Sequence, residues 1–276
     1  MLTEEQKKSF ADNGYIVLDK FFSETDLVEF RNMLIHIVKK YLKKAKEKVP
    51  DLIPENFEGK ELDEGMNKLE EIDHKYIADI YDTIFQTSQF LRITSKKEIS
   101  ENINQIMGRG LNDPLYVDQS RCRIDTPFDP HMKKCGWHQE VFYYVPKSEF
   151  VQIWAPLIHD ATIENGAVEV CIGSHKKIAK QSNEKRENEK YPFIVDELEV
   201  VKHSKQIMEL KLGQLLIFSS NLIHRSGNNT SKQVRYSLVG INHNLDNEYF
   251  VPPKLIVEKK EQKMNEYYSK VFEKDK

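Results

Sequence analysis

The chain has few cysteines and no long hydrophobic run. Its 276 residues include only three cysteines, Cys122, Cys135 and Cys171, and none belongs to a CxxC pair. We therefore expect free thiols in a reducing cytoplasm rather than a disulfide framework. No run of about 18 apolar residues occurs, so no membrane span is expected. The acidic start, Met1-Leu-Thr-Glu-Glu, does not resemble a secretory signal.

An excess of charge of one sign is also missing. The 41 basic and 44 acidic residues give a formal net charge of only −3. Nothing in this balance indicates a nucleic-acid or membrane-surface partner. The length suits one large domain or two small ones. We expect a small-molecule substrate, and the sequence leaves the oligomeric state open.

The first part of the chain carries helical patterns. Thr3-Glu-Glu-Gln6 has the form of a capping box, and Ser23-Glu-Thr-Asp26 can cap a second, longer helix. Between them, Gly14-Tyr-Ile-Val-Leu18 predicts a strand. Two further helices are predicted over 76–84 and 96–107. The highly charged segment 45–75 is interpreted as a surface excursion.

The second part of the chain has the character of a β-protein. From about Leu115, short β-like runs alternate with turn signals such as Asn165-Gly166. Many short strands after a group of helices predict a mainly β fold with flanking helices and a jelly-roll core. The polar segment 176–192 is expected to be a loop or lid. The predicted strands are 116–124, 136–145, 150–159, 168–172, 195–201, 206–210, 215–218 and 234–242.

A His-x-Glu pair lies at the start of one predicted strand. Residues i and i+2 of a strand face the same way, so His138 and Glu140 would point together, with Gln139 opposite. A second histidine from a distant strand would complete three ligands on one side of a metal. That arrangement leaves the open positions that iron(II) oxygenases need for co-substrate and O₂. Alone, the spacing is more often an ordinary pair on a surface strand.

The best partner for this pair is His224. It follows the apolar run Leu215-Leu-Ile-Phe218, and Arg235 comes eleven residues after it. Alternation along 234–239 places Arg235 and Ser237 on one face of a strand. An arginine in an apolar strand needs a matching negative charge. A bound dicarboxylate would suit its guanidinium, and a buried ion pair with a protein Asp or Glu is the alternative.

Taken together, these blocks resemble the phytanoyl-CoA dioxygenase (PhyH) family of Fe(II)/2-oxoglutarate-dependent oxygenases. Trp137-His-Gln-Glu140 is similar to the family's WHQD block. The stretch from Trp154 to Gly166, with Gly173-Ser-His-Lys176, is similar to its W…NG…GSHK block. The series Gly213…Phe218…His224…Asn228…Arg235 is similar to its C-terminal block. The resemblance covers most of the chain except about 45–75, 177–205 and the tail.

The resemblance implies a double-stranded β-helix (cupin-like jelly roll) in one domain over 1–276. Its parts would be a helical flank of about 1–112, a core of about 113–250 and a charged tail of 251–276. It also implies iron(II), 2-oxoglutarate and O₂ as cofactor and co-substrates, with no catalytic residue beyond the metal centre. The metal ligands match His138, Glu140 and His224. The residues around 2-oxoglutarate match Arg235, Ser226 and Trp154, and Ser237 is added because it shares the face of Arg235.

The implied activity is oxidation of an unactivated C–H bond, with 2-oxoglutarate converted to succinate and CO₂. The family usually has aspartate where this chain has Glu140. Glutamate is a ligand of the same hard type, and related halogenating enzymes lack a carboxylate at this place. Hydroxylation is therefore favoured over halogenation, but the substrate is not identified.

Three further side chains are weaker candidates for substrate binding. Arg121 and Arg123 share a strand face and could bind an anionic substrate if that face looks inward. Tyr143 flanks the metal strand, where core packing is the simpler role. His243 follows the arginine strand and could approach substrate. The alternative to an oxygenase is a non-catalytic or other-metal cupin-type binding protein or isomerase.

Overall fold

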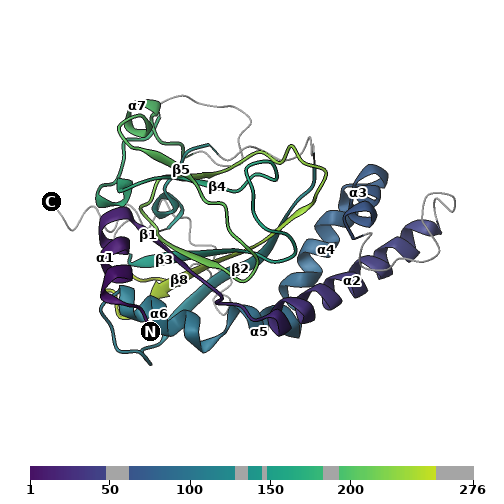
Figure 1. Cartoon of the computed structure of the whole chain (residues 1–276), viewed down its shortest axis with the longest axis horizontal. Helices are drawn as coiled ribbons and strands as arrows, with labels where there is room; N and C mark the ends of the chain where they lie inside the picture. Colours follow the sequence, from purple (N-terminus) through teal and green to yellow (C-terminus); the bar gives the residue numbers. More distant parts are fainter. Residues whose placement is uncertain (48–61, 128–135, 145–147, 183–192, 253–276) are drawn as a thin grey trace.

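The computed structural model describes residues 1–47, 62–127, 136–144, 148–182 and 193–252. Most helices come first along the chain and most strands follow, as Figure 1 shows. The elements are α1 (Glu4–Asn13), β1 (Tyr15–Leu18), α2 (Glu24–Lys46), α3 (Leu62–Ile72), α4 (Lys75–Phe85), α5 (Ser88–Thr94), α6 (Lys97–Ile106), β2 (Leu115–Asp125), η3 (Glu140–Tyr143), β3 (Phe150–Pro156), β4 (Val168–Cys171), η4 (Ser174–Lys176), α7 (Glu197–Val200), β5 (Lys205–Ile207), β6 (Leu215–Ser219), β7 (His224–Ser226) and β8 (Arg235–Asn244).

Both predicted helix starts are capped as expected. The Thr3 side chain accepts a hydrogen bond from the backbone of Gln6, whose own side chain accepts one from the backbone of Thr3. Ser23 and Asp26 form the same reciprocal pair at the start of α2. Each pair satisfies two backbone N–H groups that a helix start leaves without partners. The two capping boxes therefore set where α1 and α2 begin.

Two antiparallel sheets face each other. The larger has the strand order β1-β6-β3-β8-β2, and the smaller has the order β5-β4-β7. Trp154 and Phe218 of the large sheet share one apolar cluster with Val168 and Val170 of the small sheet. Two sheets that enclose a common core form the jelly roll predicted above. The fold class is therefore confirmed: antiparallel sheets with flanking helices.

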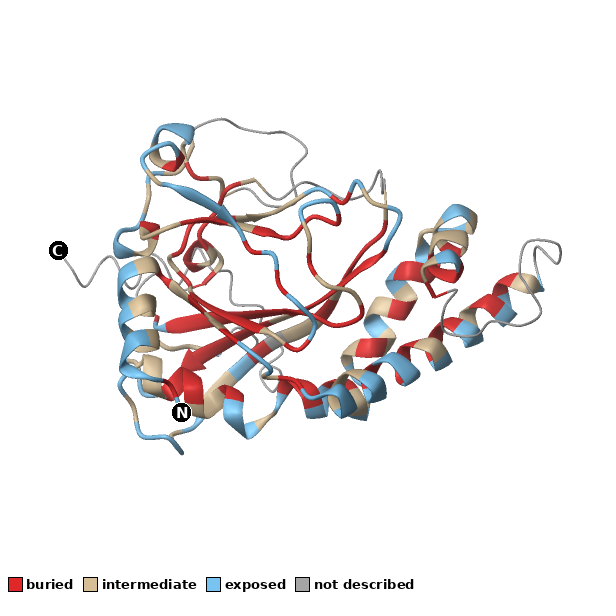
Figure 2. Cartoon of the chain, viewed as in Figure 1, coloured by how far each residue is buried: buried red, intermediate tan, exposed pale blue. Residues whose placement is uncertain are grey.

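Helices cover the other face of the large sheet. Ile153, Tyr236 and Leu238 from the strands share a cluster with Phe30 and Leu34 of α2. Figure 1 shows α2 to α5 gathered beside this face, with the small sheet across the large one from them. The central strands β3, β6 and β8 are consequently buried on both faces (Figure 2).

A β-bulge changes which residues of β2 look inward. Asp118 pairs with Ile241 of β8, and the next registered pair is Arg121 with Val239. Three steps on β2 therefore match two steps on β8, so one extra residue is accommodated. As a result Asp118 and Arg121 both lie on the inner face, although they differ by an odd number of residues.

Two local predictions outside the candidate site were wrong. The charged segment 45–75 was interpreted as a surface excursion, but α3 lies within it and buries Leu62, Met66 and Leu69 at helical spacing. The helix was missed because it contains few large apolar residues, so its sequence resembles the charged residues around it. Residues 48–61 of the segment lie outside the described residues. The run 195–201 was expected to be a strand, but Asp196 caps the short helix α7.

The cysteines and the apolar segments bear on two expectations from composition. Cys122 and Cys171 are buried free thiols, while Cys135 lies outside the described residues. In the part of the chain that the structure describes, no helix is both long and apolar enough to span a bilayer.

Candidate metal centre

The His-x-Glu pair does not lie on a regular strand. His138 forms an isolated β-bridge with His224, closed by two backbone hydrogen bonds of 3.0 Å in opposite directions. Glu140 then begins the 3₁₀-helix η3. The predicted strand 136–145 is therefore wrong beyond the bridge, because the chain turns away from β7 at once. Gln139 between the two ligands is still extended, so the chain leaves the strand conformation only at Glu140.

Three potential metal ligands converge here. One ligating atom from each of His138, Glu140 and His224 lies within 4.8 Å of the other two. His138 Nε2 is 3.6 Å from Glu140 Oε2, and the ring centroids of His138 and His224 are 4.2 Å apart. The two histidines are buried and Glu140 is partly exposed. This set of two imidazoles and one carboxylate could hold a divalent transition metal.

Backbone carbonyl groups orient both imidazoles. Nδ1 of His138 lies 2.9 Å from the carbonyl oxygen of Gly136, and Nδ1 of His224 lies 2.9 Å from that of Leu222. A carbonyl can only accept, so each Nδ1 carries the proton and each Nε2 has the lone pair that binds a metal. Burial, and then the neighbouring His138, lower the pKa of His224 well below its ordinary value. The neutral, metal-binding form of the ring is therefore favoured.

Gln139 fixes the short segment that carries two of the three ligands. Its side chain is fully buried, and its amide nitrogen donates to the carbonyl oxygens of Lys177 and Asn221 at 2.9 and 2.5 Å. Its amide oxygen accepts from the backbone of Ala179 at 2.8 Å. These bonds join the segment to the loop before His224. Gln139 does point away from the metal ligands, as the sequence predicted.

Arg235 already has a protein partner. Its guanidinium is buried, and both Nε (3.0 Å) and Nη2 donate to Oδ2 of Asp125 on β2. Nη1 donates to the carbonyl oxygen of Asn165 at 3.2 Å. The ion-pair alternative raised from the sequence is therefore confirmed as a contact. These three contacts use three of the five N–H groups, so the pair does not rule out a further carboxylate.

The other predicted co-substrate residues lie between the sheets or next to the metal ligands. Trp154 packs in the cluster shared by both sheets. Ser226 follows His224 by two residues on β7. Ser237 lies on the face of β8 that carries Arg235, is fully buried, and its hydroxyl lacks a hydrogen-bond partner among the described residues. Its hydroxyl is therefore able to form a hydrogen bond with a bound ligand.

The weaker candidates lie around the same inner space. Arg123 pairs across the strands with Ser237, and Arg121 pairs with Val239, which itself pairs with Trp154. Their backbone positions therefore lie on the inward face, which was the condition set for binding an anion, and the Arg121 side chain also bonds Tyr81 of α4. Tyr143 meets His138 edge-on, with ring centroids 6.1 Å apart.

Two polar residues of this inner face were not singled out in advance. Asp125 has no exposed surface and lies between two arginines, and Gln152 Nε2 is buried with no partner among the described residues. The alternation of Arg121, Arg123 and Asp125 was a usable signal for Asp125. His243 is buried among aromatic rings at the far end of β8, and burial lowers its pKa to about 4.

Comparisons with known proteins show which sequences and folds this chain is similar to. Bovine (Bos taurus) peroxisomal phytanoyl-CoA dioxygenase is 22% identical over 251 residues, which cover 86% of this chain and 67% of that protein. EctD from S. alaskensis, solved with 2-oxoglutarate and 5-hydroxyectoine, is 18% identical with a TM-score of 0.58, covering 89% of this chain and 77% of the other.

A second solved structure is the epimerase SnoN in complex with Fe³⁺, alpha ketoglutarate and nogalamycin RO. It is 12% identical with a TM-score of 0.56, covering 87% of this chain and 83% of the other. The sequence pattern of the phytanoyl-CoA dioxygenase (PhyH) family matches residues 10–237 of this chain. With a match over that much of its length, the chain belongs to the phytanoyl-CoA dioxygenase (PhyH) family.

Proposed function

We propose that the chain is an Fe(II)- and 2-oxoglutarate-dependent oxygenase. It hydroxylates an unactivated C–H bond of a small metabolite or carrier-bound intermediate and releases succinate and CO₂. The observation that carries this proposal is the convergence of His138, Glu140 and His224 within 4.8 Å, with both histidines oriented by backbone carbonyls. Family membership supports the same class of chemistry.

His138, Glu140 and His224 would hold the metal from one side. A divalent iron bound there supplies the O₂ chemistry that protein side chains lack. The half-buried Glu140 adds one negative charge, which partly offsets the charge of the cation. The protein contributes position and the exclusion of water, because the two histidines are buried and the apolar ring of Phe218 lies 4.9 Å from that of His224.

Arg235 would bind the distal carboxylate of 2-oxoglutarate. Two of its N–H groups remain beyond the three contacts described. The unpaired hydroxyl of Ser237 and the nearby Ser226 would add donors, and Trp154 would form an apolar wall. Arg121, Arg123 and Tyr143 would face the substrate.

Within this class of enzymes, hydroxylation has to be distinguished from halogenation and epimerisation. The EctD structure holds 2-oxoglutarate and 5-hydroxyectoine, a hydroxylated compound, whereas SnoN is an epimerase whose structure holds alpha ketoglutarate. Glu140 favours hydroxylation over halogenation, since the carboxylate occupies the position that a halide would need. Release of succinate across a metabolite panel, followed by mass analysis for a gain of one oxygen atom, would separate hydroxylation from epimerisation.

The metal and co-substrate roles can be tested together. Anaerobic addition of Fe(II) and 2-oxoglutarate should give a weak visible charge-transfer band in the wild type. His224→Ala should lower Mn(II) affinity by more than about 100-fold, since loss of a mere supporting partner costs 10–100-fold. Arg235→Gln should keep Mn(II) affinity but weaken 2-oxoglutarate binding roughly 30-fold or more.

Glu169→Gln is a suitable control for these variants. It breaks another arginine–carboxylate pair, with Arg225 at 2.8 Å, on the face of β4 opposite Val168 and Val170. It should leave the band unchanged. A wild type that binds Mn(II) but gives no band with Fe(II) and 2-oxoglutarate would favour the other-metal cupin alternative, and a protein that binds neither would favour the non-catalytic one.

Partners and location complete the proposal. We propose a small-molecule substrate, no nucleic-acid or membrane partner, and a cytoplasmic location. The bovine relative is named as peroxisomal, so the location of a fluorescent fusion would decide between the two compartments.

A further inference from the structure

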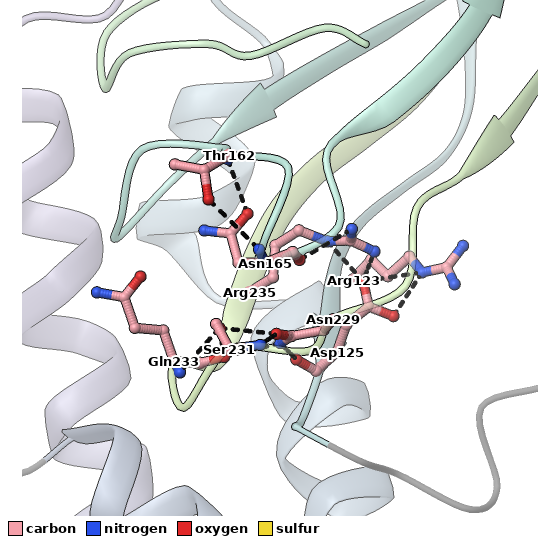
Figure 3. Close-up of polar contacts among 8 residues, drawn as sticks. All are labelled: Arg123, Asp125, Thr162, Asn165, Asn229, Ser231, Gln233 and Arg235. Carbon is pink, nitrogen blue, oxygen red and sulfur yellow. Dashed lines mark hydrogen bonds and ion pairs between the residues drawn. The ribbon is translucent and has the colours of Figure 1, made fainter.

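A buried cluster surrounds the guanidinium of Arg235. Figure 3 shows Asp125 lying between Arg235 and Arg123 at the end of β2. Arg123 Nε donates to Oδ1 and Oδ2 of Asp125 at 2.9 and 3.1 Å, while Arg235 uses Oδ2 alone. Asp125 has no exposed surface and Arg235 is 3% exposed. Asp125 therefore joins two arginines on the inner face of the sheet.

The contact between Asp125 and Arg235 is one-sided. A fully paired arginine and aspartate usually form two parallel bonds that use both carboxylate oxygens. Here one oxygen receives both Nε and Nη2 of Arg235. The arrangement fixes the plane of the guanidinium without using all of its donors.

A tight turn holds the other side of the same guanidinium. The Asn165 carbonyl accepts from Arg235 Nη1, and the Asn165 side chain is itself bonded to Thr162 and Asp160. Gly166 follows with φ +84, and a Cβ there would lie 2.6 Å from Arg235 Nη1 and 2.6 Å from the carbonyl oxygen of Gly227. Only glycine permits this backbone to approach so closely.

Asp125 is supported in turn by the loop between β7 and β8. The Asn229 side chain donates to the backbone oxygen of Asp125 at 2.9 Å and to that of Gln233 at 2.7 Å, and it accepts from Ser231 (Figure 3). This loop joins the strand that carries His224 to the strand that carries Arg235. The position of Asp125 is thereby tied to both parts of the site.

We propose that Asp125 is a positioning residue for 2-oxo acid recognition: its carboxylate orients the guanidinium of Arg235 before the co-substrate arrives. This inference rests on the proposed function, because it assigns to Arg235 the distal carboxylate of 2-oxoglutarate. Pre-orientation lowers the entropy lost when the ligand binds. The opposing effect is electrostatic, since the charge of Asp125 repels an incoming carboxylate, and the two effects predict opposite results when that charge is removed.

Binding to the Mn(II)-loaded protein provides the test. Asp125→Asn keeps the shape and one acceptor oxygen but removes the charge. It should weaken 2-oxoglutarate binding roughly three- to tenfold, the cost of ordering one long side chain. Affinity for 2-oxopentanoate, which has the same carbon chain without the distal carboxylate, should be unchanged. Both affinities can be followed by the water-proton relaxation of Mn(II).

Several outcomes would overturn the inference. Tighter or equal 2-oxoglutarate binding in Asp125→Asn would mean that repulsion outweighs orientation. Equal weakening for both acids, or the same loss in the control Glu169→Gln, would mean a general structural role. In an Arg235→Gln background, Asp125→Asn should have no further effect on 2-oxoglutarate binding, and an added loss would show that it acts elsewhere. If Arg235→Gln alone keeps wild-type affinity, the proposed role of Arg235 fails first.

A measurement on the wild type keeps the inference testable if Asp125→Asn does not fold. The ¹⁵N-labelled side-chain Nε–H of Arg235, assigned by its absence in Arg235→Gln, should exchange slowly with water before 2-oxoglutarate is added. It should change little afterwards. A guanidinium that rotates freely until the ligand binds would contradict pre-orientation.

Discussion

The two faces of the five-stranded sheet are built from the same strands but differ in role: one packs against the helices and the other forms the candidate site. On β8, Tyr236 and Leu238 face the helices and join the apolar core, while Arg235 and Ser237 face the small sheet. Both faces are buried. The helix-facing residues are mostly apolar, whereas the inner face carries the buried charges of Asp125 and Arg235 together with the Ser237 hydroxyl and Gln152 Nε2. In this fold, buried charged side chains rather than exposed ones therefore mark the candidate site.

The largest change in the free energy of unfolding should come from a substitution on the helix-facing side. Leu238 has no exposed surface, so Leu238→Ala should lower the free energy of unfolding by about 2–5 kcal/mol. Urea unfolding would measure the loss. The Mn(II) affinity of the folded fraction should stay at the wild-type value. A fall in that affinity beyond the unfolded fraction would show that the two faces are coupled.

On the inner face, the ionisation of Asp125 should have a smaller effect on the free energy of unfolding than the loss of Leu238. Burial alone would raise the pKa of Asp125, but Arg123 and Arg235 hold that pKa below its ordinary value of 3.8. A carboxylate with a lowered folded-state pKa stabilises the protein above its unfolded-state pKa and loses that contribution as the pH falls through the folded value. Each unit of depression is worth about 1.4 kcal/mol.

Asp125→Asn should therefore be less stable than the wild type at pH 7, and the difference should shrink as the pH falls below about 4. Unfolding curves in urea between pH 7 and pH 3 would measure it. A difference that stays constant over this range would mean that Asp125 does not titrate with a lowered pKa in the folded protein.

The smallest effect on stability is expected at Ser237. Its hydroxyl has no hydrogen bond to lose among the described residues, so Ser237→Ala should change the free energy of unfolding by less than about 1 kcal/mol. If the hydroxyl binds co-substrate, 2-oxoglutarate affinity should fall roughly threefold to tenfold. Calorimetric titration of the Mn(II) protein would show it, and an unchanged affinity would remove Ser237 from the site.

Local chemistry made the helix starts and most strands predictable. Thr3 and Ser23 cap helices through side chains only three residues away. The apolar run around Leu216 predicted a strand because no competing turn residue interrupts it. The segment after His138 was misjudged, because the bridge to the distant His224 pairs His138 alone and the β-like residues that follow form the 3₁₀-helix η3.

The candidate metal site was predictable from residue type, but its supporting contacts were not. His138, Glu140 and His224 were chosen for their donor atoms and for the blocks around them. That Arg235 would meet Asp125, 110 residues away, depends on the register of β2 against β8. The bulge sets that register, and no spacing in the sequence predicts where the bulge lies.

The bulge in β2 also acts as a change of parity. Before it the even-numbered positions look inward, and after it the odd-numbered ones do. Deletion of Ser120 would remove the extra residue of the bulge and leave a regular strand pair, with Asp125 still beside Arg235. Deletion of one residue after Arg121 would instead turn charged side chains toward the helices and Ile124 toward the site. Natural length variation in this strand should therefore be confined to the two positions between Asp118 and Arg121.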